Sequence, residues 1–279
     1  MEFKGKSIVR LRCQLRVDSC VITLDYCSTV LVELTTACSS VSLSFIHLTM
    51  TWTNESNSSE EAVPNNKYQQ DGQDARTIAK HLPYFPFKGI PRFYDIGGFL
   101  AKPDIFQRIV DIFVERYKDI AIDSIAGLDA RGFILGPPIA LALKKPFLMM
   151  RKKGKMPNAL QSQDYSMEYG NREGLTVQRD KIHKGDRVLI VDDLVATGGT
   201  LSSAISLVKM LQGIVVECAC VVELKMFIDP EPDSGIPSRT KLFQELGHDH
   251  VPVWGLISED ILQEEAPLPE DYVDDGEEH

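Results

Sequence analysis

Short apolar runs alternate with amphipathic segments through the middle of the chain. Five runs have the length and aliphatic content of buried strands: 122–127, 147–150, 188–191, 215–222 and 251–257. Three segments have the spacing of helices with one apolar face: 104–117, 131–143 and 201–212. Strands that alternate with helices form a parallel sheet with helices on both faces. We therefore predict an α/β fold, a central parallel sheet flanked by helices, over residues 81–258.

The two ends of the chain have a different character. The first 49 residues show no sustained helical or strand period, and the polar stretch 54–73 is typical of a linker. We therefore expect residues 1–80 to form a poorly structured N-terminal extension, and one hypothesis for it is that natural translation starts at Met50. Positions 258–279 contain ten acidic residues and no Lys or Arg. We expect 259–279 to be an acidic, disordered tail.

Charge, hydropathy and cysteine content indicate which partners and which compartment to expect. The formal charge of −10 comes from the tail, and the rest of the chain carries thirty acidic and thirty basic residues, so no nucleic-acid partner is expected. No apolar run is long enough to span a membrane, so no membrane partner is expected. Cys218 and Cys220 alternate within a strand pattern and are expected to be buried thiols. Their reduced state would suit a cytoplasmic protein.

Residues 188–200 are the most informative segment of the sequence. An apolar strand ends at Asp192 and Asp193, and a short loop with two glycines and two threonines leads into a helix. Glycine-rich loops before a helix bind phosphate through backbone N–H groups and the positive helix end. Paired carboxylates accept hydrogen bonds from sugar hydroxyls and stabilise a cationic anomeric carbon. The segment therefore predicts a site for a ribose 5-phosphate that reacts at its anomeric carbon.

Two further segments carry cations where strands are expected to end. Arg131 lies at a helix start, where a cation is unfavourable unless it binds an anionic ligand. Residues 151–155 hold four cations in five positions. Such a cluster can bind a diphosphate, and a solvated basic turn is the alternative.

Two segments without a clear period complete the candidate site. The stretch 152–180 is long, polar and rich in Gly and Pro, as functional lids are, and it contains Glu168 between apolar neighbours. We call it the lid. The stretch 85–95 is aromatic and contains two prolines, which favour an extended strap. We call it the hood.

Three strings resemble the motifs of adenine phosphoribosyltransferases, within the type I phosphoribosyltransferase family: VLIVDDLVATGGT (188–200), LDARGF (128–133) and SMEYG (166–170). The resemblance covers roughly residues 83–226. It implies the type I phosphoribosyltransferase fold with a hood and a flexible lid hairpin. It also implies the reaction of adenine with phosphoribosyl diphosphate (PRPP) to give AMP and diphosphate. The chain departs from the family at Phe93-Tyr94-Asp95, where many members have Phe-Arg-Asp, and this puts the base contacts in question.

The resemblance assigns a role to each candidate residue. The ribose hydroxyls would be held by Asp192 and Asp193, and the 5-phosphate by Ala196, Thr197, Gly198, Gly199 and Thr200. The diphosphate would be held by Asp129, Ala130, Arg131, Arg151, Lys152 and Lys155, with a cis peptide at Asp129–Ala130. Adenine would be held by Ile90, Arg92, Tyr169 and Leu194, and the catalytic residues would be Glu168 and Arg131.

The resemblance further implies Mg²⁺, which would bridge PRPP oxygens with Asp192 or Asp193 as its nearest protein groups. It implies a homodimer in which Arg151 or Lys155 acts across the interface. Two alternatives stay open. One is a phosphoribosyltransferase for hypoxanthine, guanine, xanthine or orotate, and the other is a non-enzymatic PRPP sensor, which would need a DNA-binding segment that residues 1–80 do not suggest.

Overall fold

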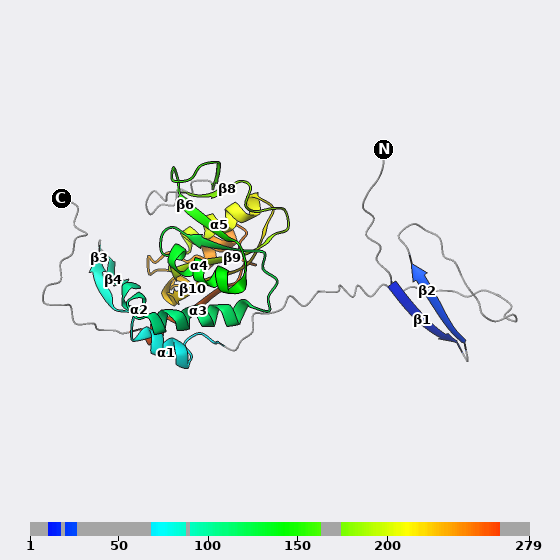
Figure 1. The fold of residues 1–279 in the computed structure, drawn as a ribbon, viewed down its shortest axis with the longest axis horizontal. Helices are drawn as coiled ribbons and strands as arrows, with labels where there is room; N and C mark the ends of the chain where they lie inside the picture. The colour runs from blue at the N-terminus through cyan, green and yellow to red at the C-terminus, as the bar shows by residue number, and fades with distance from the viewer. Residues whose placement is uncertain (1–10, 18–19, 27–67, 88–89, 163–173, 263–279) are drawn as a thin grey trace. The chain divides into compact units, whose positions relative to one another are not determined.

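The computed structural model describes residues 11–17, 20–26, 68–87, 90–162 and 174–262. They belong to two compact units, one within residues 1–58 and one within 59–279. In the first unit, β1 (Leu11–Val17) pairs with β2 (Cys20–Tyr26) in an antiparallel hairpin (Figure 1). This hairpin lies within residues 1–80, which we expected to form a poorly structured extension.

A seven-stranded sheet forms the centre of the second unit, in the order β11-β10-β9-β5-β6-β8-β7. Its strands are β5 (Ser124–Leu128), β6 (Phe147–Lys152), β7 (Ala159–Gln161), β8 (Leu175–Gln178), β9 (Arg187–Val195), β10 (Ile214–Glu223) and β11 (Val253–Ser258). The five strands from β11 to β6 are parallel, as predicted. The lid adds β8 and β7 to the edge in antiparallel orientation. The resemblance implied a hairpin in the lid, but its pairing with the sheet was not predicted.

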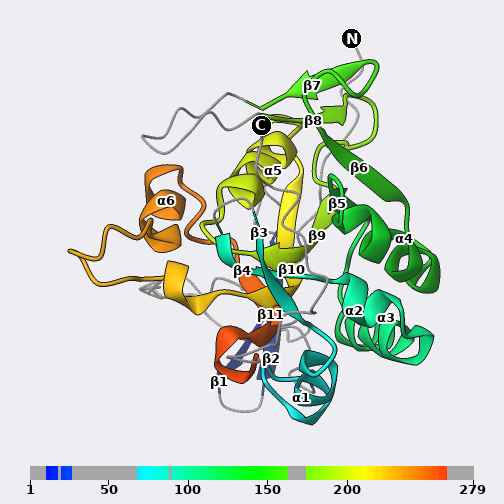
Figure 2. The same ribbon diagram turned by 90° about the vertical axis from the view of Figure 1, so that its left-hand side faces the viewer.

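Helices cover both faces of this sheet, as predicted (Figure 2). One face carries α1 (Gln73–Ala79), α2 (Gly97–Leu100), α3 (Pro103–Tyr117) and α4 (Gly132–Leu143). The other carries α5 (Gly199–Met210) and α6 (Arg239–Glu245). Strand β9 has apolar residues on both faces: Leu189 and Val191 pack on the first face, and Val188 and Ile190 pack on the second. A layer of helices is therefore needed on each face.

Both predicted limits of the folded domain need correction. Helix α1 lies inside the range expected to be poorly structured, yet Ala75 and Ile78 are buried in the core. Asp71 accepts hydrogen bonds of 2.7 Å from both the backbone N–H and the hydroxyl of Ser258. At the other end, a short 3-10 helix (Glu259–Ile261) is followed by Leu262, which is also buried. The folded part therefore extends from before residue 81 to residue 262, and positions 263–279 of the tail lie outside the described residues.

Strand β9 continues beyond the apolar run that predicted it. It runs through both aspartates to Val195, because Asp192 and Leu194 still pair with Cys220 and Val222 of β10. A second 3-10 helix (Lys225–Phe227) follows β10. Cys218 and Cys220 are both buried on one face of β10, as predicted. The hood is an antiparallel hairpin of β3 (Tyr84–Phe87) and β4 (Ile90–Tyr94).

Candidate active site

A cavity of about 250 Å³ lies at the carboxyl ends of β5 and β9, where ligands bind in parallel α/β sheets. Its lining consists of Asp129, Ala130, Arg131 and residues 192–201. The structure thus brings together the predicted ribose residues, the predicted 5-phosphate loop and the first three predicted diphosphate residues. The two sequence segments concerned lie about sixty positions apart, and the pairing of β5 with β9 places them side by side.

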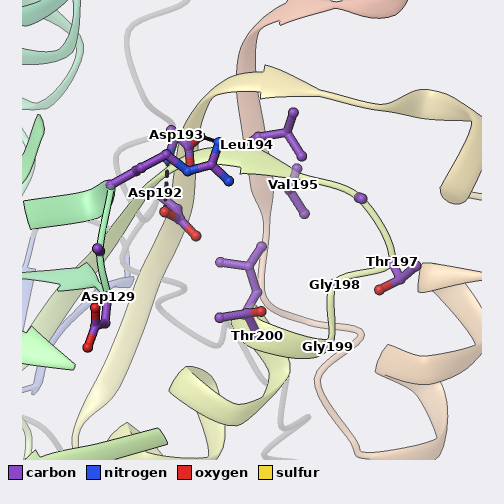
Figure 3. A pocket seen from close by; sticks show the side chains of 13 residues that line it. Asp129, Asp192, Asp193, Leu194, Val195, Thr197, Gly198, Gly199 and Thr200 are labelled. Carbon is purple, nitrogen blue, oxygen red and sulfur yellow. Dashed lines mark hydrogen bonds and ion pairs between the residues drawn. The ribbon is translucent and has the colours of Figure 1, made fainter. Parts of the chain in front are cut away.

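The loop between β9 and α5 has the backbone of an anion-binding turn. Gly198 has a φ of +78°, a conformation that favours glycine, and α5 begins at the next residue. In Figure 3 the carboxylate of Asp192 points into the space that the loop encloses, and Thr197 and Thr200 lie around the same space. The first N–H groups of α5 have no partner within the helix, so they can donate to a phosphate.

The carboxylates of Asp192 and Asp193 lie close together in the lining of the cavity. Asp193 is only 3% exposed, and its Oδ2 lies 2.9 Å from Nη1 of Arg131. Its backbone N–H donates a 3.0 Å hydrogen bond to Oδ1 of Asp192. Burial raises the pKa of Asp192 well above its ordinary value, and the Asp193 carboxylate adds to the rise. Burial also raises the pKa of Asp193, although the Arg131 guanidinium opposes that rise. A ligand that brings hydroxyl donors or a cation would relieve this excess of negative charge.

Arg131 links the cavity to the hood. It precedes the first residue of α4, as predicted, and the Asp129–Ala130 peptide before it is cis, as the resemblance implied. Its guanidinium carbon lies 5.1 Å from the ring centre of Phe93 on β4, within the range of a cation–π contact. No role for Phe93 was predicted, because it is one of four aromatic residues in the hood and no local pattern distinguishes it from the others.

The basic cluster lies beside the cavity without lining it. Nε of Arg151 is 3.5 Å from Oδ2 of Asp129, and Nη1 of Arg151 donates a 2.9 Å hydrogen bond to the carbonyl of Lys155. Neither residue is among those that line the cavity, and the same holds for Lys152, whose side chain is exposed at the end of β6. Asp129 connects the cluster to the cavity, because it belongs to the lining and contacts Arg151.

The predicted adenine residues fall into three groups. Leu194 lines the cavity. Ile90, which is 49% exposed, and Arg92, which lies 5.5 Å over the ring of Tyr84, belong to the hood and do not line it. Tyr169 lies outside the described residues, as does the predicted catalytic Glu168. Tyr94, where the chain departs from the family pattern, is buried against Tyr84 in the hood, and burial raises its pKa.

The described part of the chain has neither a metal-binding cluster nor a membrane-spanning helix. It holds no group of three or more His, Cys, Asp or Glu side chains arranged for a metal ion. None of its helices has the length and apolar content needed to cross a membrane.

Comparison with known proteins agrees with this geometry. The sequence profile of the phosphoribosyl transferase domain matches residues 96–244. Adenine phosphoribosyltransferase 2 of Arabidopsis thaliana is 50% identical over 146 residues, which are 52% of this chain and 75% of the relative.

Solved structures of adenine phosphoribosyltransferases have the same fold. The enzyme of Leishmania donovani superimposes with a TM-score of 0.65 and 28% identity, over 72% of this chain and 87% of that one. The enzyme of Trypanosoma brucei, solved in complex with AMP, pyrophosphate and ribose-5-phosphate, gives a TM-score of 0.59 and 32% identity, over 70% and 84% of the two chains. The chain therefore belongs to the phosphoribosyltransferases, enzymes that transfer a pentosyl group, and within them to the adenine phosphoribosyltransferases.

Proposed function

We propose that this protein transfers the 5-phosphoribosyl group of PRPP to adenine, giving AMP and diphosphate. One observation carries the proposal: a carboxylate pair, a glycine-rich loop at a helix start and an arginine line the same cavity. These groups match the three parts of PRPP, namely its ribose, its 5-phosphate and its diphosphate. The Trypanosoma brucei relative was solved with ribose-5-phosphate, pyrophosphate and AMP, which supports this assignment.

The 5-phosphate would bind in the loop 196–200. Its backbone N–H groups and the positive end of α5 attract an anion, and the hydroxyls of Thr197 and Thr200 supply further donors. The ribose would then extend toward Asp192 and Asp193, which line the cavity on the β9 side. Their ionised carboxylates would accept the ribose hydroxyls and stabilise the positive charge that develops at C1 as the diphosphate leaves.

The diphosphate would draw Arg131 away from Asp193. The side chain of Arg131 is 39% exposed, so it can turn toward an incoming anion. Asp129 and Ala130, which precede it, also line the cavity. Arg151, Lys152 and Lys155 would complete the diphosphate site when the lid approaches, from this subunit or from a partner.

The reacting base would be enclosed by the hood and the lid. Leu194 would pack on adenine from the cavity side, with Ile90, Arg92 and Tyr169 as further contacts. Glu168 would exchange a proton with the base. We predict that Glu168→Gln lowers kcat by about 10²-fold or more, in the range of general acid–base catalysis, with the Kd for PRPP little changed. Steady-state kinetics and PRPP titration check this; an unchanged kcat with weaker PRPP binding would contradict it.

The carboxylate pair also fits a magnesium ion that enters with PRPP. Asp192 and Asp193 offer the oxygen ligands that Mg²⁺ prefers, and two adjacent carboxylates are too few to form a complete site. PRPP oxygens and water would therefore supply most of the ligands. When bound, the ion would neutralise charge on the diphosphate as it leaves.

A homodimer is the assembly that the surface favours. Helix α4 is apolar on nearly all sides, and Leu141 is 80% exposed, Met149 on the neighbouring β6 46% and Ile134 40%. Such exposed apolar groups are typical of a surface that another subunit covers. Since Arg131 precedes α4, an interface there would lie near the cavity. Sedimentation velocity tests the dimer, and a monomer at micromolar concentration would contradict it.

We propose the cytoplasm as its compartment. Cys218 and Cys220 are free, buried thiols, which suits a reducing environment. Immunolocalisation of the native protein tests this, and a signal confined to an organelle or the cell exterior would contradict it.

Diphosphate release from PRPP, measured separately with adenine, hypoxanthine, guanine, xanthine and orotate, tests the proposed activity. The expected result is release with adenine that requires Mg²⁺ and yields AMP in equal amount. Release with another base alone would favour the alternative phosphoribosyltransferase, and binding of PRPP without release would favour a sensor.

A further inference from the structure

A buried arginine packs against the loop 196–200, the proposed 5-phosphate site. Arg239, the first residue of α6, is 5% exposed, and its side chain packs directly against Gly198. A Cβ atom at Gly198 would lie 2.7 Å from Cγ and 2.9 Å from Cδ of Arg239. The backbone of the loop therefore packs on the aliphatic part of this side chain, so the position of the loop depends on the position of Arg239.

The position of Arg239 depends in turn on Glu223. The two side chains form a buried ion pair between Nη2 and Oε1. Nη1 of Arg239 is buried and has no hydrogen-bond partner among the described residues. Glu223, the last residue of β10, is therefore the ion-pair partner that holds this guanidinium. Glu223 pairs in register with Val195, the last residue before the loop, so the ion pair connects α6 to β10, the strand that lies beside the end of β9.

Gln70, which is far from Glu223 in the sequence, also contacts the Glu223 carboxylate. Its Nε2 donates a 2.8 Å hydrogen bond to Oε2 of Glu223, the oxygen that does not face Arg239. Gly255 of β11 packs closely on Glu223, where a Cβ atom would lie 2.4 Å from Cβ of the glutamate. Gly255 therefore leaves room for the Glu223 side chain, and Gln70 holds its carboxylate through a hydrogen bond. Gln70 lies outside residues 96–244, the part of the chain that matches the family profile.

We propose that Gln70, Glu223 and Arg239 are positioning residues for the 5-phosphate, with Gln70 acting through the other two. This inference rests on the proposed function, because it takes the loop 196–200 to be the phosphate site. The effect follows from geometry: backbone donors bind a phosphate well only when they are held in place, and displacement by a fraction of an ångström weakens several hydrogen bonds at once.

Ribose 5-phosphate and diphosphate, titrated separately into the full-length protein by calorimetry, distinguish this role from general stabilisation. For Gln70→Ala we expect the Kd for ribose 5-phosphate to rise about 3- to 10-fold, the range of one net hydrogen bond, while the Kd for diphosphate changes less than about 2-fold. Gln69→Ala is the matched control, because the neighbouring glutamine is exposed and the same atoms are removed. It should leave both constants unchanged.

A double-mutant cycle shows whether Gln70 acts through Glu223. In a Glu223→Ala background, which removes the acceptor, Gln70→Ala should add no further loss of ribose 5-phosphate affinity. Arg239→Lys, which keeps the charge and most of the stem, should lose less affinity than Arg239→Ala. Thermal unfolding of each variant confirms that the native state is populated during the titrations.

The inference is overturned if Gln70→Ala lowers the Tm but leaves the Kd for ribose 5-phosphate unchanged, or weakens both ligands equally. The proposed function fails by a different result, namely a wild-type protein that binds ribose 5-phosphate yet makes no AMP from adenine and PRPP. A wild type that does not bind ribose 5-phosphate would overturn both.

Discussion

At the scale of single residues, the site keeps charges that are unfavourable until a ligand arrives. Burial and a neighbouring carboxylate raise the pKa of Asp192, so its ionised form costs free energy in the folded protein. Arg131 forms an ion pair with Asp193, and under the proposed function it would leave that contact to bind a diphosphate. Sites prepared for a cationic transition state commonly carry such a cost in stability.

Asp192→Asn should therefore stabilise the protein while it impairs catalysis. Because the folded-state pKa of Asp192 is raised, wild-type stability falls as the pH rises from the ordinary aspartate value through the raised one. The variant escapes this loss. We expect its Tm to exceed that of the wild type at neutral pH, by about 2–4 °C for each kcal/mol in a domain of this size. The difference should disappear at low pH, where both forms are uncharged.

Calorimetric unfolding of both proteins between acid and neutral pH measures this difference. A variant that is less stable than the wild type at neutral pH would mean that Asp192 is stabilised by its surroundings, and the argument from burial would be wrong.

Some residues of the site could be predicted from the sequence and others could not. The carboxylate pair, the loop glycines and Arg131 could be predicted because each belongs to a short contiguous string with recognisable chemistry. Phe93, Glu223 and Gln70 could not, because folding alone brings them to the site. Gln70 and Glu223 are 153 positions apart, and no local pattern connects them.

At the scale of elements, hydrophobic runs located the five parallel strands of the central sheet but not where each one ends. The apolar run of β9 stops at Val191, yet the strand continues to Val195 because β10 supplies pairing partners for the aspartates. The hydrophobic pattern did not reveal β7 and β8, and only the resemblance implied a hairpin in the lid. They are short, lie in a polar segment, and owe their existence to pairing at the edge of the sheet.

The turn from β9 into α5 gives a test at this scale. Gly198→Ala adds a methyl group at a φ of +78° and also drives it into Arg239. Gly185→Ala is the matched control, because Gly185 has a φ of +87° but nothing within 4 Å of the added atom. We expect the control to lose about 1 kcal/mol of stability from backbone strain alone.

Gly198→Ala should lose about 1–3 kcal/mol more than the control, the usual cost of overpacking, and its KM for PRPP should rise. Denaturant unfolding and steady-state kinetics provide the comparison. Equal losses in the two variants, with an unchanged KM, would show that the contact with Arg239 does not constrain the loop.

At the scale of the whole molecule, the folded domain includes residues that composition assigned to an extension. The N-terminal part of this unit precedes the family match at residue 96, yet Asp71 binds Ser258 and α1 buries Ile78. The segment is polar at its start, so its sequence resembles a linker. It is ordered through partners at the far end of the chain, which composition cannot reveal.

Shortened chains test where the domain begins. A protein that starts at residue 59, the boundary between the two units, should keep the Tm and the activity of the full chain. One that starts at residue 81 loses α1 and the contacts of Asp71 and Gln70. We expect it to lose at least about 3 kcal/mol of unfolding free energy, since a buried Ile alone contributes about 1.5–3 kcal/mol. Equal unfolding curves for the two would place the boundary at residue 81 after all.

The central claim is that the carboxylate pair and the loop after it hold the two ends of a ribosyl phosphate while its anomeric carbon reacts with adenine. Single-turnover formation of AMP from adenine, PRPP and Mg²⁺ tests it most directly, with the wild type compared against Asp192→Asn combined with Asp193→Asn. We predict a rate at least about 10²-fold lower in the double variant, as when electrostatic stabilisation of a transition state is removed, with the fold intact by circular dichroism. A folded double variant that forms AMP at the wild-type rate would contradict the account.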